Sequence, residues 1–423
     1  MRSAALASLV VIGLAASAAA QGGATADGTT PLHWAAYKDD VAGAAALVKS
    51  GANVNAANDL GATPLWLASL NGSSPMVRAL LGAGANPNLA LLAGETPLMI
   101  AARTGNADVV DQLAKKGANL NARAARGQTA LMWAVAQQHP DVVKVLLAHR
   151  ADVHVKSETW SQMMAVPPHG RLEYNRLIPH GGETALLFAA RVGDLESAKL
   201  LVAAGANIND ADAWGVSATT LAAHTGFIDI VEFLLEKGAS PDSPNGDFAA
   251  LHVAVMRRDE RMVAALLSHR ADPNVRLRNW TPTRRSSADL NFPQHLVGAT
   301  PLWMAARFSN PALMRLLVKH GADPNFVHKA DYWADGLISQ HRVEATTVLM
   351  AAAGMGAAGA TPWLPIPREQ RDALTLETVK TAVELGAGLD AVNADGRTAL
   401  DGARALKLES VVNFLVDKGA RGR

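Results

Sequence analysis

The histidines that could take part in chemistry follow tryptophans in polar stretches. Imidazole can carry a proton or bind zinc or copper. The pairs are Trp160 and His180, Trp280 and His295, and Trp333 and His341. Metal ligands must converge, whereas His180 lies far before the other two histidines in the sequence. We therefore expect no metal, and no hydrolytic site built from Glu183, Asp335 and His341.

Another motif typical of catalytic proteins does not occur in the structural context that it requires. Residues 354–359 have the sequence Gly-Met-Gly-Ala-Ala-Gly, which matches the glycine pattern of dinucleotide-binding loops. That loop requires a strand before it and a helix after it, but here it follows an expected helix and leads into a proline-rich stretch. The sequence has no cysteine, which excludes thiol catalysis, disulfides and cysteine-ligated zinc. We therefore predict no enzyme and no cofactor.

A repeated phrase supplies the elements that must position these side chains. Thr-Pro-Leu begins at Thr30, Thr63 and Thr96, 33 residues apart, and Thr129 begins a variant 33 residues later. Threonine is a good helix N-cap, and proline at the first helical position loses no needed donor. An apolar second helix follows each phrase and ends in Gly-Ala-Asn or a variant, where glycine permits a left-handed cap. Such a unit can bury its faces only by stacking on neighbours.

The phrase recurs ten times, and this pattern resembles the ankyrin repeat family. The later copies begin at Thr184, Ser217, Ala249, Thr300, Thr347 and Thr398. The resemblance covers essentially all of residues 21–423 and implies an all-α repeat solenoid of about ten stacked helix-turn-helix repeats joined by hairpin loops. It also implies structural roles for His33 and His252, which would bond to neighbouring backbone.

Four insertions interrupt the repeats. Three extended hairpin insertions lie at about 154–183, 275–299 and 326–346, and the fourth, at about 354–372, falls between the two helices of one repeat. The resemblance implies that the first three share one edge. We expect their side chains to form a binding surface, because exposed aromatics and arginines are typical interface anchors. Its residues would be Trp160, Arg171, Tyr174, His180, Trp280, Arg284, Arg285, His295, Tyr332, Trp333 and His341.

Alternatively, each tryptophan packs onto its own hairpin, since long loops need a core of their own.

Before two of the insertions, the usual glycine at the end of the preceding helix is replaced by Arg150 and Arg270. We therefore expect local differences at those helix ends. We also expect the insertion at 275–299 to be removable without loss of helical structure.

A second candidate surface follows from the resemblance, because residues just after the Ala-Ala pair face the concave groove of ankyrin repeats. These positions hold Tyr37, Arg103, Arg191, His224 and Arg307, and Arg257 lies nearby. Recurrent arginine would suit a partner with acidic patches. The alternative is an ordinary solvated face.

The first twenty residues are typical of a secretory signal. Arg2 precedes an apolar run from Leu6 to Ala16, and residues 18–20 are an Ala-Ala-Ala site. We expect residues 1–20 to be cleaved and residues 21–423 to act in the periplasm or outside a bacterial cell. The full sequence has 39 basic and 38 acidic residues, so loss of Arg2 leaves a neutral chain. We therefore expect no nucleic-acid binding and no stable membrane insertion.

Together these features predict a monomeric scaffold that binds a protein or peptide through its groove and its loop edge. The alternative is a module that binds a small ligand, a glycan or a metal, possibly with hydrolytic activity, built from the insertions that carry tryptophan and histidine.

Overall fold

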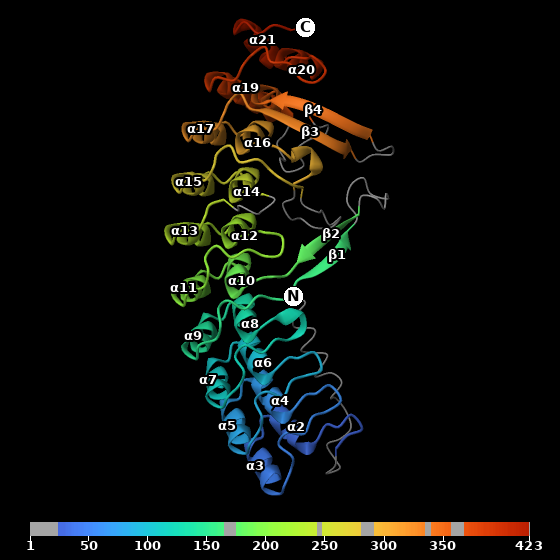
Figure 1. Ribbon diagram of the computed structural model, residues 1–423, viewed down its shortest axis with the longest axis vertical. Coiled ribbons are helices and arrows are strands. Elements are labelled where there is room, and N and C mark those ends of the chain that lie inside the picture. Colours follow the sequence, from blue (N-terminus) through green and yellow to red (C-terminus); the bar gives the residue numbers. More distant parts are fainter. Residues whose placement is uncertain are drawn as a thin grey trace. The chain divides into compact units, whose positions relative to one another are not determined.

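The computed structural model describes residues 24–164, 175–242, 248–280, 292–334, 340–356 and 368–422 (Figure 1). The chain divides into two compact units. The first unit is Met1–Thr159 with Gly181–Asn207, and the second is Trp160–His180 with Ile208–Arg423.

The described part of the first unit contains five helix pairs. Its inner helices are α2 (Pro31–Tyr37), α4 (Pro64–Asn71), α6 (Pro97–Arg103), α8 (Ala130–Ala136) and α10 (Ala185–Val192). Its outer helices are α3 (Val41–Lys49), α5 (Ser74–Gly82), α7 (Ala107–Lys115), α9 (Pro140–Ala148) and α11 (Leu195–Ala203). A short 3-10 helix, η1 (Ala125–Gly127), lies before α8. Each inner helix packs on the next inner helix, and each outer helix packs on the next outer one.

The second unit repeats this arrangement. Its inner helices are α12 (Ala218–Thr225), α14 (Ala250–Arg257), α16 (Pro301–Arg307), α18 (Val348–Ala352) and α20 (Ala399–Ala405). Its outer helices are α13 (Ile228–Glu236), α15 (Glu260–Ser268), α17 (Pro311–Lys319), α19 (Arg368–Glu384) and α21 (Glu409–Asp417). The described residues thus form ten helix pairs, which confirms the predicted all-α repeat solenoid.

The repeated phrase forms the start of each inner helix. The hydroxyls of Thr63, Thr96 and Thr129 each accept a hydrogen bond from the backbone N–H three residues later. The leucine and alanine residues that follow are buried between inner helices; Leu65 and Ala68, for example, are at most 1% exposed. Each buried leucine contributes about 1.5–3 kcal/mol to folding, while alanine lets neighbouring helices approach closely.

Two histidines of the repeat bond to neighbouring backbone, as the resemblance implied. His33 Nδ1 accepts from the backbone N–H of Thr30, and its Nε2 lies 2.9 Å from the carbonyl oxygen of Ala62 in the next repeat. In His252, Nδ1 accepts from the N–H of Ala249, and Nε2 lies 3.3 Å from the carbonyl oxygen of Ala299. Both rings are fully buried, so these histidines join successive repeats.

A ladder of asparagine side chains runs along the hairpin turns. Each of these amides accepts a hydrogen bond from a backbone N–H of the following repeat at 2.7–3.0 Å. The members of this asparagine ladder are Asn55, Asn88 and Asn121 in the first unit and Asn209, Asn274 and Asn325 in the second. The last asparagine of the Gly-Ala-Asn-x-Asn phrase therefore couples one layer to the next.

Replacing Asn88 by alanine is expected to lower the free energy of unfolding by about 1 kcal/mol. Asn88 accepts from the N–H of Asn119 at 2.7 Å and donates to the carbonyl of Gly117 at 3.0 Å, and both bonds are exposed. Urea denaturation followed by circular dichroism measures the loss. Asn88→Asp keeps the acceptor and loses the donor, so it should cost less than alanine does. Equal losses in the two variants would contradict this account of the ladder.

The helix ends at Arg150 and Arg270 do not differ from the others, contrary to expectation. Their φ angles are 67° and 68°, in the same left-handed region as Gly51 and Gly84 at the equivalent ends. The outer helices before them, α9 and α15, have nine residues, as α5 does. Stacking therefore imposes the left-handed cap even on arginine, for which it is unfavourable.

The first and third insertions each form a β-hairpin. Strand β1 (Trp160–Met164) pairs antiparallel with β2 (Arg176–His180), and β3 (Val327–Ala334) pairs antiparallel with β4 (Gln340–Thr347). The second insertion contributes a 3-10 helix, η3 (Gln294–Leu296), against which β3 packs. The fourth insertion ends earlier than expected, because α19 begins at Arg368 and extends over 17 residues.

Candidate interaction surfaces

In the first insertion, Trp160 and His180 are direct partners across the β1–β2 hairpin. Their rings stack with centroids 5.2 Å apart and planes inclined by 20°. On the opposite face of the strands, Met163 pairs with Leu177, and these side chains are 57% and 62% exposed. Alternation along a strand explains the two faces. This hairpin therefore presents an apolar pair on one face and a tryptophan–histidine stack on the other.

The third insertion repeats the tryptophan–histidine pairing. Trp333 and His341 are direct partners across β3 and β4, with ring centroids 5.3 Å apart. His341 Nε2 also lies 2.6 Å from a carboxylate oxygen of Asp331 on the same face. Tyr332 lies between Asp331 and Trp333 on β3, and its side chain is buried on the opposite face of the hairpin. Its hydroxyl donates a hydrogen bond to Glu344 at 3.0 Å. Burial first, and Glu344 second, raise the pKa of Tyr332 to about 12.

The second insertion is anchored by a residue that the sequence analysis missed. Phe292 is 0% exposed, and its ring lies 5.2 Å from Phe248 and 6.3 Å from His252. Trp280 is only partly buried, so it is not the anchor of this insertion. The position of Phe292 argues against the expectation that the insertion can be removed without structural loss.

His295 lies beside the third insertion, and its ring is 5.8 Å from that of Tyr332. Burial, followed by the charge of Arg307 and by His328, lowers the pKa of His295 to about 4. The imidazole is therefore neutral at physiological pH. Four other predicted residues of the insertions lie outside the described part of the chain: Arg171, Tyr174, Arg284 and Arg285.

Two arginines of the predicted groove are paired within their own repeats. Arg103 lies 3.0 Å from Glu95, and the two side chains are only 14% and 17% exposed. Arg103 also lies over the ring of Trp133, 5.3 Å from its centroid. Arg191 makes the equivalent ion pair with Glu183. Each glutamate directly precedes the N-cap threonine, and each arginine lies near the end of the same inner helix, so carboxylates already neutralise these positions.

The remaining groove residues have different surroundings. Arg257 is exposed and donates to the carbonyl of His224 at 3.0 Å, which ties two repeats together. Tyr37 is half-buried against Trp34, with ring centroids 6.2 Å apart. Arg307 lies at the end of α16, where burial lowers the pKa of its guanidinium and the charge of Glu344 opposes this shift.

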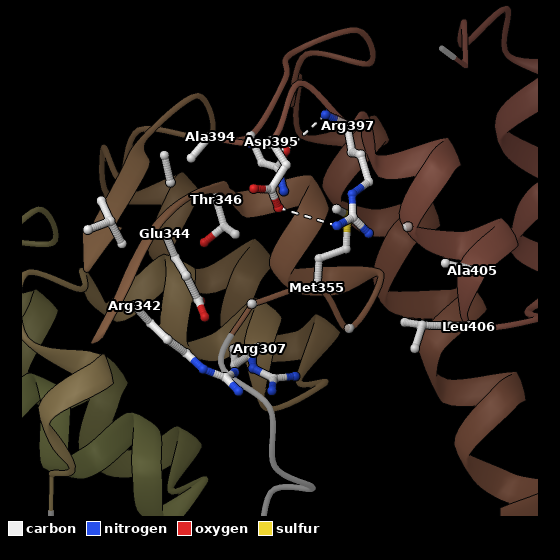
Figure 2. Close-up of a pocket in the computed structure, with 16 residues that line it drawn as sticks. Arg307, Arg342, Glu344, Thr346, Met355, Ala394, Asp395, Arg397, Ala405 and Leu406 are labelled. Atoms are coloured by element: carbon white, nitrogen blue, oxygen red, sulfur yellow. Dashed lines mark hydrogen bonds and ion pairs between the residues drawn. The ribbon is translucent and has the colours of Figure 1, made fainter. Parts of the chain in front are cut away.

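Arg307 is also part of a cavity of about 540 Å³ in the second unit (Figure 2). Arg342, Glu344 and Thr346 reach it from β4. Asp395 and Arg397 come from the turn before α20 and form an ion pair at 3.4 Å. Of these residues, only Arg307 was expected from the sequence. The available signal was the alternation of polar residues at 342, 344 and 346, which places all three on one face of a strand.

Within the described residues, no three histidine, aspartate or glutamate side chains gather as a metal site would require. In the same residues, no helix has the length and apolar character needed to cross a bilayer.

Family models for ankyrin repeats match residues 7–90, 87–157 and 186–277, and a single-repeat model matches residues 297–329. These matches cover more than half of the chain. The chain is an ankyrin-repeat protein. Ankyrin repeats generally mediate protein–protein interaction and are generally non-catalytic.

Several eukaryotic proteins are similar to this ankyrin-repeat protein over part of their length. A putative palmitoyltransferase of Danio rerio, ZDHHC13, is 26% identical over 251 residues, which are 54% of this chain and 34% of that protein. The palmitoyltransferase ZDHHC13 of Homo sapiens is 35% identical over 101 residues, or 23% of this chain and 16% of its own. An ankyrin repeat and KH domain-containing protein of Caenorhabditis briggsae, CBG24701, is 28% identical over 259 residues, which are 59% of this chain and 9% of that protein.

The chain thus spans about a third or less of each of these relatives. Palmitoyl transfer is the named activity of two of them, and the matched stretches cover only ankyrin repeats. None of the three relatives is bacterial, so they lend no support to the bacterial origin expected from the sequence.

Proposed function

We propose that this ankyrin-repeat protein is a scaffold that binds a protein or peptide through its inner-helix groove and its insertion hairpins. One observation carries the proposal. Stacking uses the leucine and alanine faces of the helices, whereas the hairpins hold tryptophan, histidine and exposed apolar side chains that no repeat requires. Aromatic side chains of this kind are frequent anchors at interfaces.

Site-specific photo-crosslinking in the full chain tests which surface meets the partner. A photoreactive amino acid at Leu177 or Trp333 is expected to form covalent adducts with a partner in extracts of the source cells. The same group at Glu236, exposed on outer helix α13, is the matched control and should form none. Adducts from Glu236 alone would place the partner on the outer helices and overturn the proposal.

We further propose that residues 1–20 direct export of a bacterial protein. The support is the order of charge, apolar run and small residues near the N-terminus. N-terminal sequencing of protein recovered from its own cell tests this, because cleavage should leave Gln21 first. An intact first residue on a cytoplasmic protein would refute export.

A small-ligand module is the second candidate function. It is favoured by the cavity of about 540 Å³ in the second unit, since this volume is typical of small-molecule sites.

A further inference from the structure

The cavity around Arg307 carries an excess of one positive charge. Three arginines and two carboxylates line it, and one carboxylate, Asp395, is already paired with Arg397. The remaining charged groups are Arg307, Arg342 and Glu344. Figure 2 shows both of these guanidinium groups extending into the cavity below the carboxylate of Glu344. One negative charge from a ligand would therefore neutralise the net charge of the residues that line the cavity.

A buried hydroxyl in the same cavity lacks a partner. Thr346 is 3% exposed, and its Oγ1 makes no hydrogen bond with any of the described residues. Thr346 follows Glu344 and Arg342 on the same face of β4, and it lines the cavity with them. Several buried polar atoms lack a partner among the described residues, and Thr346 Oγ1 is the one whose residue lines this cavity. A buried polar atom without a partner loses its hydrogen bonds to water, and a ligand oxygen beside this hydroxyl would supply the missing acceptor.

The rest of the wall is small or apolar. Gly354 and Gly356 have φ angles of 83° and 93°; Gly356 leaves space beside Thr346 and Glu344, and Gly354 leaves space beside Leu406. Met355 and Leu406 supply apolar surface. The cavity therefore combines donors at one end with room for the carbon atoms of a short side chain.

We propose that this cavity binds a carboxylate of an acidic peptide segment, which accepts hydrogen bonds from Thr346 Oγ1 and the guanidinium of Arg342. Arg307 supplies the second positive charge. The proposal rests on the proposed function, since the peptide belongs to the partner. A monoanionic carboxylate matches the single excess charge. A phosphate monoester carries nearly two charges, and Glu344 would repel the second.

Selection of a random dodecapeptide display library on the full chain tests this inference. Selected peptides are expected to be rich in aspartate and glutamate. Changing their acidic residues to asparagine and glutamine should weaken binding about tenfold or more, because hydrogen bonds to charged groups are strong. Arg342→Gln should weaken the acidic peptides to a similar extent. Arg261→Gln, which changes an exposed arginine on α15 outside the cavity, is the matched control and should leave affinity unchanged.

Thr346→Val separates binding from folding. It keeps the shape of the side chain and removes the hydroxyl, so affinity should fall about three- to tenfold. The midpoint of urea denaturation should be unchanged or higher, because a buried unpaired donor is removed. Unchanged affinity in both Thr346→Val and Arg342→Gln would overturn the inference.

The outcomes also distinguish the inference from the function on which it rests. Selection of tightly binding peptides that contain no acidic residues would support the scaffold function but refute the carboxylate site. Peptides that gain affinity when phosphoserine replaces the acidic residue would refute the preference for a monoanion. Glutarate binding as tightly as the peptides would indicate a site for free carboxylic acids and refute the peptide. Failure to select any peptide would refute both proposals.

Discussion

Replacing Phe292 by alanine is expected to lower the free energy of unfolding of the second unit by about 3–5 kcal/mol. The ring is 0% exposed and packs against Phe248 and His252 of the preceding repeat. Removal would leave a cavity beside a histidine whose hydrogen bonds join two repeats. Because each repeat contacts only its neighbours, the loss should concentrate in the helices on either side of the insertion.

Urea denaturation and hydrogen exchange measure this effect. Protection of α14 and α16 should fall more than that of the distant α20. Trp280→Ala, in the same insertion but partly exposed, is the matched control, with an expected loss of less than about 1 kcal/mol. Comparable losses in the two variants would show that Phe292 is no more important than an ordinary surface aromatic.

Acidification from about pH 6.5 to pH 4 is expected to destabilise the second unit through His252. Burial, only partly opposed by hydrogen bonds to backbone carbonyls, lowers the pKa of His252 from 6.5 to about 4 in the folded chain. The unfolded chain therefore binds the proton first as the pH falls. Stability contributed by the neutral ring is present above the unfolded pKa and is lost as the pH approaches the folded one. The loss amounts to about 3 kcal/mol over this window.

His295 adds to the same trend, since its pKa is also lowered to about 4. Its side chain is less completely buried, so its contribution should be smaller.

Urea midpoints taken at intervals between pH 7 and pH 4.5 measure this dependence. His252→Gln removes the titrating ring and should flatten the decline, although it lowers stability at neutral pH. His154→Gln changes an exposed histidine and serves as the control, with the wild-type slope expected. A wild-type midpoint that does not move across this range would refute the assignment.

The helical stack could be predicted from the sequence because its signals are local. A threonine or serine cap, a buried leucine and a glycine or asparagine turn lie within one repeat and recur along the chain. The roles of His33 and His252 followed in the same way, since each bonds to the repeat next to it.

The insertions could not be predicted to this extent, because their order depends on pairing between distant residues. The sequence showed a tryptophan and a histidine in each, but not that Trp160 and His180 are opposed on paired strands. The importance of Phe292 was missed because its partner, Phe248, lies in another repeat. Likewise, the cavity joins side chains from α16, β4 and the turn before α20, and stacking alone brings them together.

The left-handed helix ends have a consequence for protein engineering. Among the described residues, eight that are not glycine have φ angles between 51° and 68°, including Arg150, Arg258 and Arg270. Each holds a conformation that costs an L-residue about 1 kcal/mol or more, and neighbouring layers absorb that cost. Glycine at Arg150 or Arg270 therefore offers a route to a more thermotolerant chain, whereas the Arg258 side chain donates hydrogen bonds to the carbonyls of Phe308 and Ser309 in the next repeat and should be kept.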